Sequence, residues 1–259
     1  MSAAEPDFID VDGANIAVRN RTGQVAPGVV WLGGYRSDML GTKAVVLDEW
    51  AEKTGRSALR LDYSGHGESG GDFSQGTISR WLNESLAVLA KYTQGPQILV
   101  GSSMGGWIAL RMAQELKKVG KSPAGIVLIA PAPDFTAELV EPSLTDAQKK
   151  DLIEQGYFEE PSDYSPNPYI YTRALIEDGR NNLVLKGIIE TGCPVHILQG
   201  MQDEAVPYQH ALKLVEHLPV DDVTLTLVRD GDHRLSRPQD LELLIRTVSG
   251  LAERISLGE

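Results

Sequence analysis

Short apolar runs alternate along most of the chain with longer segments in which apolar residues recur every three or four positions. The short runs predict buried strands, and the longer segments predict helices with one buried face. The predicted strands are GVVWLGG, SALRLDY, PQILVG, AGIVLIA (124–130), PVHILQG (194–200) and VTLTLVRD (223–230). The predicted helices cover about 42–54, 77–92, 106–119, 208–217 and 238–255.

The first twenty residues have a different pattern, a weak alternation in FIDVDGANIAVRN with Asp12-Gly13 between its halves. This pattern predicts a β-hairpin, because Asp-Gly is a common two-residue hairpin turn. Strands that alternate with helices predict a mostly parallel sheet with helices on both faces. We therefore expect an α/β protein with an eight-stranded sheet, whose working residues lie on loops at the carboxyl ends of the strands.

One long segment interrupts the alternation. Between Pro131 and Gly192 we find no strand pattern, six prolines, and helix-like pieces near 146–155 and 169–178. The segment also carries a set of aromatic and apolar residues: Phe135, Leu139, Leu144, Tyr157, Phe158, Tyr164, Tyr169 and Tyr171. An insertion of this length usually forms a lid or a binding element. We expect residues 1–259 to form a single domain in which 132–192 is a modest helical lid.

The stretch ILVGSSMGGW places two adjacent serines after an apolar run. Only Ser103 has glycine at both the second position before it, Gly101, and the second position after it, Gly105. A nucleophile on a sharp strand-to-helix turn requires small residues at these two places. Helix capping is the alternative role for the serines, but it does not explain both glycines. The pattern predicts Ser103 as a nucleophile.

A serine hydroxyl needs a base, and five histidines are candidates. His233 lies in the loop after the last predicted strand, and His66 lies between two glycines in another such loop. His196, His210 and His217 fall within a strand or a helix, where core or surface roles are favoured. We favour His233, because the chain order in this architecture is nucleophile, acid, histidine.

The acid that orients the base is expected in the loop after the preceding strand. HILQGMQDEAVP offers Asp203 there, and we interpret the adjacent Glu204 as a solvated loop residue. Asp134, which follows the AGIVLIA strand, is the reserve candidate. Asp232 is too near His233 in the sequence to orient the far side of its ring. Asp203 is therefore the predicted acid.

An oxyanion hole usually consists of two backbone N–H groups. One is expected from Met104, the residue after the nucleophile, and the other from Tyr35 in the loop WLGGYRSDM. Gly34, Arg36 and Ser102 flank these two groups and are the predicted substrate contacts. Removal of one such donor costs about 3 kcal/mol of transition-state stabilisation.

Charge and cysteine content narrow the class of protein. The formal net charge of −12 makes nucleic acid and anionic membrane surfaces poor partners. The single cysteine, Cys193, excludes an internal disulfide and is interpreted as a small apolar core residue. No stretch is long and apolar enough to span a bilayer. The N-terminus MSAAEPDFID shows neither a signal peptide nor an Arg-rich transit pattern, so we expect a cytoplasmic protein.

Four motifs in order, GSSMGG, LDYSGHGESGGDF, LQGMQDEAVP and GDHR, resemble the α/β-hydrolase family along nearly the whole chain. More narrowly, PGVVWLGGYRSDMLGTKA, LDYSGHGESGGDF, GPQILVGSSMGGW and GDHR are similar to mitochondrial acyl-protein thioesterases of that family, which are also described as acyl-glucuronide esterases. The resemblance implies the same nucleophile, acid, base and oxyanion amides as the residues selected above. Arg36 departs from the small residue expected after the tyrosine, and it points either to solvent or to the pocket mouth. The targeting segment of those relatives is not seen here, which favours a bacterial cytosolic homologue.

The resulting hypothesis is a serine hydrolase that cleaves carboxylic esters or thioesters of a small-molecule or acylated substrate through an acyl-enzyme. No His, Cys and carboxylate cluster has ligand spacing, so we expect no metal and no organic cofactor. Carbon–carbon bond hydrolysis, amide hydrolysis and perhydrolysis on the same scaffold remain alternatives. A non-catalytic ligand receptor is a further alternative, although the chain keeps all three predicted residues, Ser103, Asp203 and His233. The sequence leaves the oligomeric state open.

Overall fold

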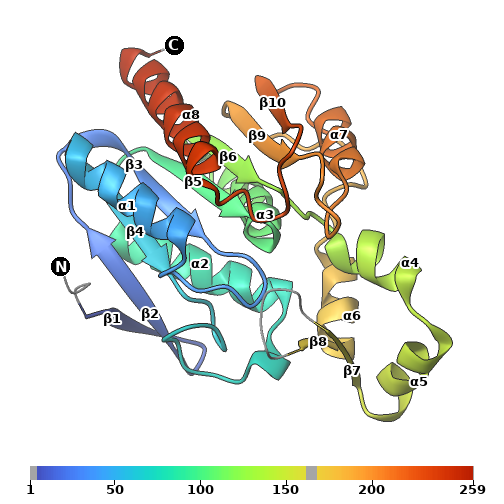
Figure 1. Cartoon of the computed structure of the whole chain (residues 1–259). Helices are drawn as coiled ribbons and strands as arrows, with labels where there is room; N and C mark the ends of the chain where they lie inside the picture. The colour runs from blue at the N-terminus through green and yellow to red at the C-terminus, as the bar shows by residue number, and fades with distance from the viewer. Residues whose placement is uncertain (1–4, 162–167, 259) are drawn as a thin grey trace.

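A computed structural model describes residues 5–161 and 168–258 of the chain. Its main sheet contains eight strands: β1 (Asp7–Val11), β2 (Ala14–Arg21), β3 (Val25–Leu32), β4 (Arg56–Leu61), β5 (Gln97–Ser102), β6 (Gly125–Ile129), β9 (Val195–Gly200) and β10 (Val223–Val228). Their order across the sheet is β1-β2-β4-β3-β5-β6-β9-β10 (Figure 1). The β1–β2 and β2–β4 pairs are antiparallel and the other pairs are parallel. The predicted α/β-hydrolase fold with its mostly parallel sheet is confirmed.

Helices cover both faces of this sheet. They are α1 (Thr42–Thr54), α2 (Ile78–Tyr92), α3 (Met104–Lys118), α7 (Tyr208–Glu216) and α8 (Pro238–Leu257). Residues of α1 and α8 share one buried apolar cluster, and residues of α2, α3 and α7 share the other. Figure 1 shows α1 and α8 on the near side of the sheet and α2 and α3 behind it. Among the described helices, none is long and apolar enough to cross a membrane.

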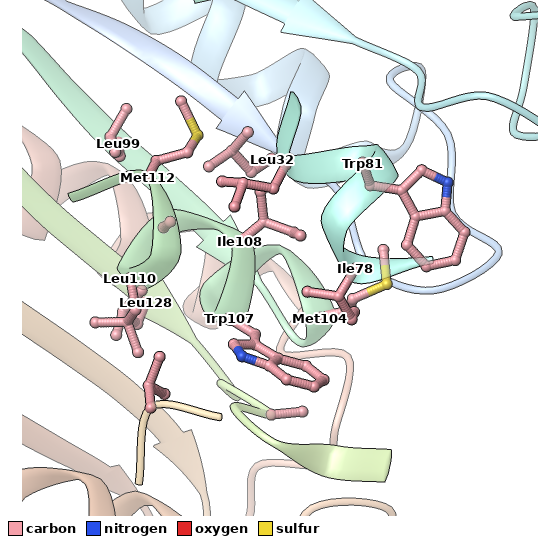
Figure 2. Packing of buried hydrophobic residues seen from close by; sticks show 14 of the residues in the cluster. Leu32, Ile78, Trp81, Leu99, Met104, Trp107, Ile108, Leu110, Met112 and Leu128 are labelled. Carbon is pink, nitrogen blue, oxygen red and sulfur yellow. The ribbon is translucent and has the colours of Figure 1, made fainter. Parts of the chain in front are cut away.

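The central strand β5 is buried on both faces, which explains why its sequence is apolar without alternation. Leu99 belongs to the cluster under α2 and α3, whereas Ile98 and Val100 belong to the cluster under α1 and α8. Figure 2 shows Leu32 and Leu99 on the side of the sheet that α3 covers. Because β5 ends at Ser102, this packing fixes where the chain leaves the sheet ahead of Ser103.

The N-terminal hairpin forms as predicted. Asp7 to Val11 pair antiparallel with Val18 to Ala14. The turn residues Asp12 and Gly13 have φ angles of 50° and 80°. Positive φ at both central positions is the requirement of the tight hairpin turn that Asp-Gly favours.

The insertion segment (132–192) differs from its prediction. Its described part contains a π-helical turn η2 (Thr136–Val140), α4 (Glu141–Ser143), α5 (Asp146–Glu154), β7 (Tyr157–Glu160), β8 (Tyr169–Thr172) and α6 (Arg173–Asn181). Helix α5 was predicted, but the absence of strands was wrong, because β7 and β8 pair antiparallel in a separate two-stranded sheet. The helix predicted near 169–178 begins only at Arg173. Tyr164 and Pro166 lie outside the described residues.

The composition of β7 and β8 explains why they form strands, and their short length explains why the sequence did not predict them. The sequence YIYT is aromatic and β-branched, and such residues favour a pleated, half-buried surface over a helix. A strand of four residues gives no readable period by itself, and its partner YFEE is equally short. Figure 1 shows these elements together on one side of the main sheet.

The burial of Leu99 gives a stability prediction for this core. Leu99 is 1% exposed, so Leu99→Ala removes buried methyl groups and leaves a cavity in the central strand. We expect the free energy of unfolding, measured by chemical denaturation, to fall by about 2–5 kcal/mol. The matched control is Leu212→Ala, since Leu212 is 40% exposed, and it is expected to change stability by less than about 0.5 kcal/mol. Equal losses in the two variants would contradict this description of the core.

Candidate active site

Ser103 lies in a sharp turn between β5 and α3. Its φ angle is 54°, in the left-handed region that residues other than glycine rarely adopt. The turn is also tightly packed: a Cβ added at Gly101 would lie 2.4 Å from the carbonyl oxygen of Gly105. A Cβ added at Gly105 would lie 2.1 Å from the carbonyl oxygen of Leu32. Both flanking positions therefore require glycine, as the sequence pattern indicated.

The neighbouring strand β6 holds this turn in place. The Ser103 N–H donates to the carbonyl oxygen of Ile129 at 2.9 Å. The Ser103 carbonyl oxygen accepts from the N–H groups of Gly106, at 2.9 Å, and Ala132, at 3.1 Å. The backbone of Ser103 is thus fixed by both of its polar groups, and its hydroxyl is free to contact other side chains.

A chain of hydrogen bonds joins Ser103 to the predicted base and acid. His233 Nε2 lies 3.1 Å from Ser103 Oγ, and His233 Nδ1 lies 2.8 Å from Asp203 Oδ2. The Asp203 side chain is fully buried and the His233 side chain is 18% exposed. Since the carboxylate accepts the proton on Nδ1, Nε2 is left as an acceptor for the serine hydroxyl. The structure brings together three residues that are distant in the sequence.

Asp203 is held by contacts that the sequence did not predict. Its Oδ1 accepts the Val206 N–H at 2.7 Å, and its Oδ2 accepts the Gln199 side-chain amide at 3.1 Å. Gln199 is fully buried and also donates to the Val206 carbonyl oxygen. The available signal was a polar residue inside the otherwise apolar end of VHILQG. Gln199 therefore fixes the carboxylate toward His233.

The loops that carry Asp203 and His233 are in direct backbone contact. A Cβ at Gly200 would lie 2.3 Å from the Gly231 carbonyl oxygen, so only glycine fits there. The Gln202 N–H donates to the same carbonyl oxygen at 2.9 Å. This close approach sets the separation between the two loops, and hence between the carboxylate and the imidazole.

The loop after β3 lies beside Ser103. A Cβ added at Gly34 would lie 3.3 Å from the Cβ of Ser103. The Gly34 carbonyl oxygen accepts the Ser37 N–H at 3.1 Å, and in a trans peptide the Tyr35 N–H points the opposite way. Met104 begins α3, so its N–H has no partner within the helix. The two predicted oxyanion donors thus belong to backbone next to Ser103, and their role remains a prediction.

The side chain of Tyr35 joins this loop to the insertion segment. Its hydroxyl donates to the Ile170 carbonyl oxygen in β8. Its ring stacks on Tyr171 with centroids 5.5 Å apart and an interplanar angle of 2°. Burial raises the pKa of Tyr35 well above its ordinary value, so the hydroxyl stays a neutral donor. Movement of β8 would therefore act directly on the loop that carries Tyr35.

The three predicted substrate contacts lie in different environments. Gly34 borders Ser103, whereas Ser102 is the buried last residue of β5. The Arg36 guanidinium lies 4.4 Å from the centroid of the Phe73 ring. Arg36 also lines an open hollow of about 250 Å³. Contact of these residues with substrate remains a prediction.

The other candidate acids have separate roles. Asp134 is buried and accepts the backbone N–H groups of Val184 and Leu185. Burial raises the pKa of Asp134, and its contacts place it in the packing of the insertion segment. Glu204 is exposed, as expected for a solvated loop residue. Asp232 accepts a backbone N–H within its own loop.

The other histidines are also engaged elsewhere. His210 Nε2 donates to the Pro133 carbonyl oxygen at 2.7 Å, and His217 Nδ1 donates to the Gly187 carbonyl oxygen at 2.7 Å. Burial lowers the pKa of His196, which lies within β9, and also that of His210.

His66, the reserve base, is 3% exposed and uses both ring nitrogens. Nδ1 donates to the Ser64 carbonyl oxygen at 3.2 Å, and Nε2 accepts the Arg36 N–H at 3.2 Å. Burial lowers the pKa of His66 from 6.5 to about 4. The imidazole is therefore neutral at neutral pH, and it contacts the Tyr35 loop rather than serving Ser103.

The metal-ligating side chains and the single cysteine decide whether the described residues could bind a metal ion or supply a thiol nucleophile. Within residues 5–161 and 168–258, no group of three or more His, Cys, Asp or Glu side chains could hold a metal ion. Cys193 is buried, and burial raises its pKa to about 11. Its thiol is therefore protonated at neutral pH, in line with a core residue.

Comparisons with known proteins agree with this architecture. The α/β-hydrolase family model matches residues 26–242. The mouse mitochondrial palmitoyl-protein thioesterase ABHD10 is 34% identical over 243 residues, which is 93% of this chain and 80% of that protein. A structure of mouse α/β hydrolase domain-containing protein 10 gives a TM-score of 0.86 at 32% identity, covering 97% of this chain and 100% of that one. A crystal structure of a protein from Agrobacterium vitis S4, provisionally described as a hydrolase, gives a TM-score of 0.93 at 59% identity. The match covers 96% of this chain and 98% of that one.

The predicted cytoplasmic localisation is contradicted by these relatives. The curated relatives from mouse, human, Pongo abelii, cattle and rat are all named mitochondrial. The prediction relied on the acidic N-terminal residues and on a single cysteine. Low cysteine usage reports a reducing environment and does not distinguish one reducing compartment from another.

The packing around Ser103 predicts a large effect of one methyl group. Gly105→Ala places a Cβ against the Leu32 backbone, which cannot move without shifting the sheet. We expect unfolding free energy to fall by about 1–3 kcal/mol or more, with loss of the Ser103 geometry. Gly250→Ala in α8 is the matched control, because nothing lies within 4 Å of its added Cβ. It should stabilise the helix by about 0.5–1 kcal/mol. A G105A protein of unchanged stability would show that the turn is not tightly packed.

The buried His66 predicts a pH dependence of stability. Its pKa is lower in the folded state, so the unfolded chain binds its proton more tightly between about pH 6.5 and 4. Acidification through this window therefore favours unfolding, and the contribution is fully present above about pH 6.5. His66→Gln removes the titrating group, while the other buried groups stay the same. We expect the stability of wild type relative to H66Q, measured by denaturation at several pH values, to fall across this window. A pH-independent difference would contradict the burial of a neutral imidazole.

Proposed function

This chain belongs to the α/β-hydrolase family, and we propose that it hydrolyses carboxylic esters or thioesters through an acyl-enzyme formed on Ser103. The observation that carries this proposal is the hydrogen-bonded chain from Ser103 Oγ through His233 to Asp203. A serine hydroxyl is a weak nucleophile unless a base removes its proton as it attacks. His233 Nε2 lies 3.1 Å from Oγ, within hydrogen-bond reach of that proton, which supports His233 as the base.

In the first step, Ser103 Oγ attacks the acyl carbonyl carbon and its proton passes to His233 Nε2. The imidazolium formed in this way is stabilised by the buried Asp203 carboxylate, 2.8 Å from Nδ1. The carbonyl oxygen becomes an oxyanion, for which the N–H groups of Tyr35 and Met104 are the proposed donors.

Collapse of the tetrahedral intermediate breaks the bond from the carbonyl carbon to the leaving oxygen or sulfur. His233 returns the proton to this leaving group, and the acyl group stays on Ser103 as an ester. A water molecule then loses a proton to His233 Nε2 and attacks the acyl-enzyme. The acid is released as His233 returns the proton to Ser103 Oγ, so the cycle consumes one water molecule and no other reagent.

An apolar acyl group suits the surroundings of the site. The insertion segment (132–192), which we propose as a lid within a single domain, contributes aromatic rings next to the Tyr35 loop. Rings of Phe135, Tyr169 and Tyr171 lie 5.5–6.1 Å from that of Tyr35. The names of the ABHD10 relatives, palmitoyl-protein thioesterases, further favour acyl thioesters among the substrates.

The proposed nucleophile gives a direct kinetic prediction. Ser103→Ala should abolish turnover of p-nitrophenyl esters and acyl-CoAs, because the acyl-enzyme cannot form. Asp203→Asn should lower kcat by about 10⁴-fold, since the tautomer and orientation of His233 are lost. Both proteins should keep their fold by circular dichroism. The measurement is initial rate and burst amplitude across a panel of increasing acyl chain length.

The control is Ser249→Ala, which removes a hydroxyl on α8 that accepts from the Trp50 indole N–H of α1, away from the site. It should keep wild-type rates. Full activity in S103A would refute Ser103 as nucleophile. A wild-type protein with neither burst nor turnover on the whole panel would instead favour a ligand receptor.

A further inference from the structure

The loop between β3 and α1 contains a strained residue beside the site. Arg36 has a φ angle of 56°, in the left-handed region, although it is not glycine. Such a conformation persists where the surrounding structure holds it, and it often occurs at functional sites. Arg36 directly follows Tyr35, the proposed oxyanion donor. A hydrogen-bond partner that holds the backbone at Arg36 would therefore also act on the adjacent Tyr35.

His66 is the side chain that hydrogen-bonds to the Arg36 backbone. Its Nε2 accepts the Arg36 N–H at 3.2 Å. Its Nδ1 donates to the Ser64 carbonyl oxygen at 3.2 Å, which leaves Nε2 as the acceptor. The ring itself is packed edge-on against three aromatic rings, with centroids 5.0–5.5 Å away: Tyr63, Phe73 and Trp81. The acceptor is thus rigidly placed.

The two peptide groups of Tyr35 are fixed from different directions. The Gly34–Tyr35 peptide is held through its carbonyl oxygen, which accepts the Ser37 N–H at 3.1 Å. The Tyr35–Arg36 peptide is held through its N–H, which donates to His66. Fixing both planes fixes the direction of the Tyr35 N–H, since each peptide is planar. Gly34 lies against Ser103, so a small rotation here would move the N–H relative to the reacting carbonyl.

We propose that His66 is a positioning residue of the oxyanion hole, which holds the strained Tyr35–Arg36 peptide so that the Tyr35 N–H faces the developing oxyanion. This inference rests on the proposed function and adds a residue outside the Ser103, His233 and Asp203 set. His66 touches neither substrate nor reacting atoms. It acts through one hydrogen bond to the backbone.

If His66 were only structural, its substitution would affect the protein through lost ring packing. If His66 positions the loop, substitution acts through loss of the acceptor for the Arg36 N–H. Two substitutions separate these roles, because each keeps one ring hydrogen bond. His66→Asn places its amide near the Nδ1 position and has no acceptor within reach of Arg36. His66→Gln places its amide oxygen near the Nε2 position. His66→Met fills the space without an acceptor and replaces H66N if that protein does not fold.

We expect H66N to lower kcat by about 10–100-fold, because a misplaced donor stabilises the transition state less than an aligned one. KM should change by less than about 3-fold, since ground-state binding is retained. H66Q should recover most of kcat. The affinity for a trifluoromethyl ketone, which forms a tetrahedral adduct on a serine, should fall in H66N by the same factor as kcat/KM. The matching methyl ketone should bind equally to all variants.

The control is Ser85→Ala, a buried hydroxyl of α2 that bonds to Trp81 and does not contact the loop. It should lower the melting temperature without changing kcat. The proposal is overturned if folded H66N keeps wild-type kcat. It is also overturned if H66N and H66Q lose activity equally while trifluoromethyl ketone affinity is unchanged. An inactive wild-type protein is a different result, which removes the proposed function and this inference together.

Discussion

The structure depends on a backbone constraint at the end of the central strand. Ser103 is held at a φ angle of 54° between two glycines, and neither glycine leaves room for a Cβ. Because β5 is buried on both faces, the strand cannot shift to relieve this turn. The backbone of Ser103 therefore occupies a fixed place, and the loops at the ends of the other parallel strands are arranged around its hydroxyl. The strain is local, and the packing of a whole sheet holds it.

The side chains that follow Ser103 in the hydrogen-bonded chain differ in exposure: Asp203 is fully buried, and His233 is partly exposed. The Asp203 carboxylate is fully buried and satisfied by Gln199 and the Val206 N–H, so it keeps one lone-pair direction for His233. The His233 side chain is partly exposed, at 18%. The loop carrying Tyr35 is held by the protein core on one side and by β8 on the other. Substrate contacts that move β8 would thus reach the proposed oxyanion donor, the Tyr35 N–H, through the Tyr35 side chain.

Sequence reasoning predicted the features that depend on local chemistry. Glycines around Ser103 and an Asp-Gly hairpin are local requirements, and buried strands give short continuous apolar runs, so the main sheet was predictable. The pairing of Tyr157–Glu160 with Tyr169–Thr172 was missed, because short strands outside the main sheet depend on tertiary contacts. Gln199 and His66 were not assigned their supporting roles, because a second layer of hydrogen bonds has no sequence period. Localisation was wrong, since composition does not identify a compartment.

We propose that Ser103, and not the adjacent Ser102, carries the acyl group. The most direct measurement is peptide mass spectrometry after reaction with diethyl p-nitrophenyl phosphate, with fragmentation that separates the two serines. We expect one diethylphosphoryl group per chain, on Ser103, formed in proportion to the loss of esterase activity. A modification on Ser102 or at another site, or retained hydrolysis in fully modified protein, would contradict it.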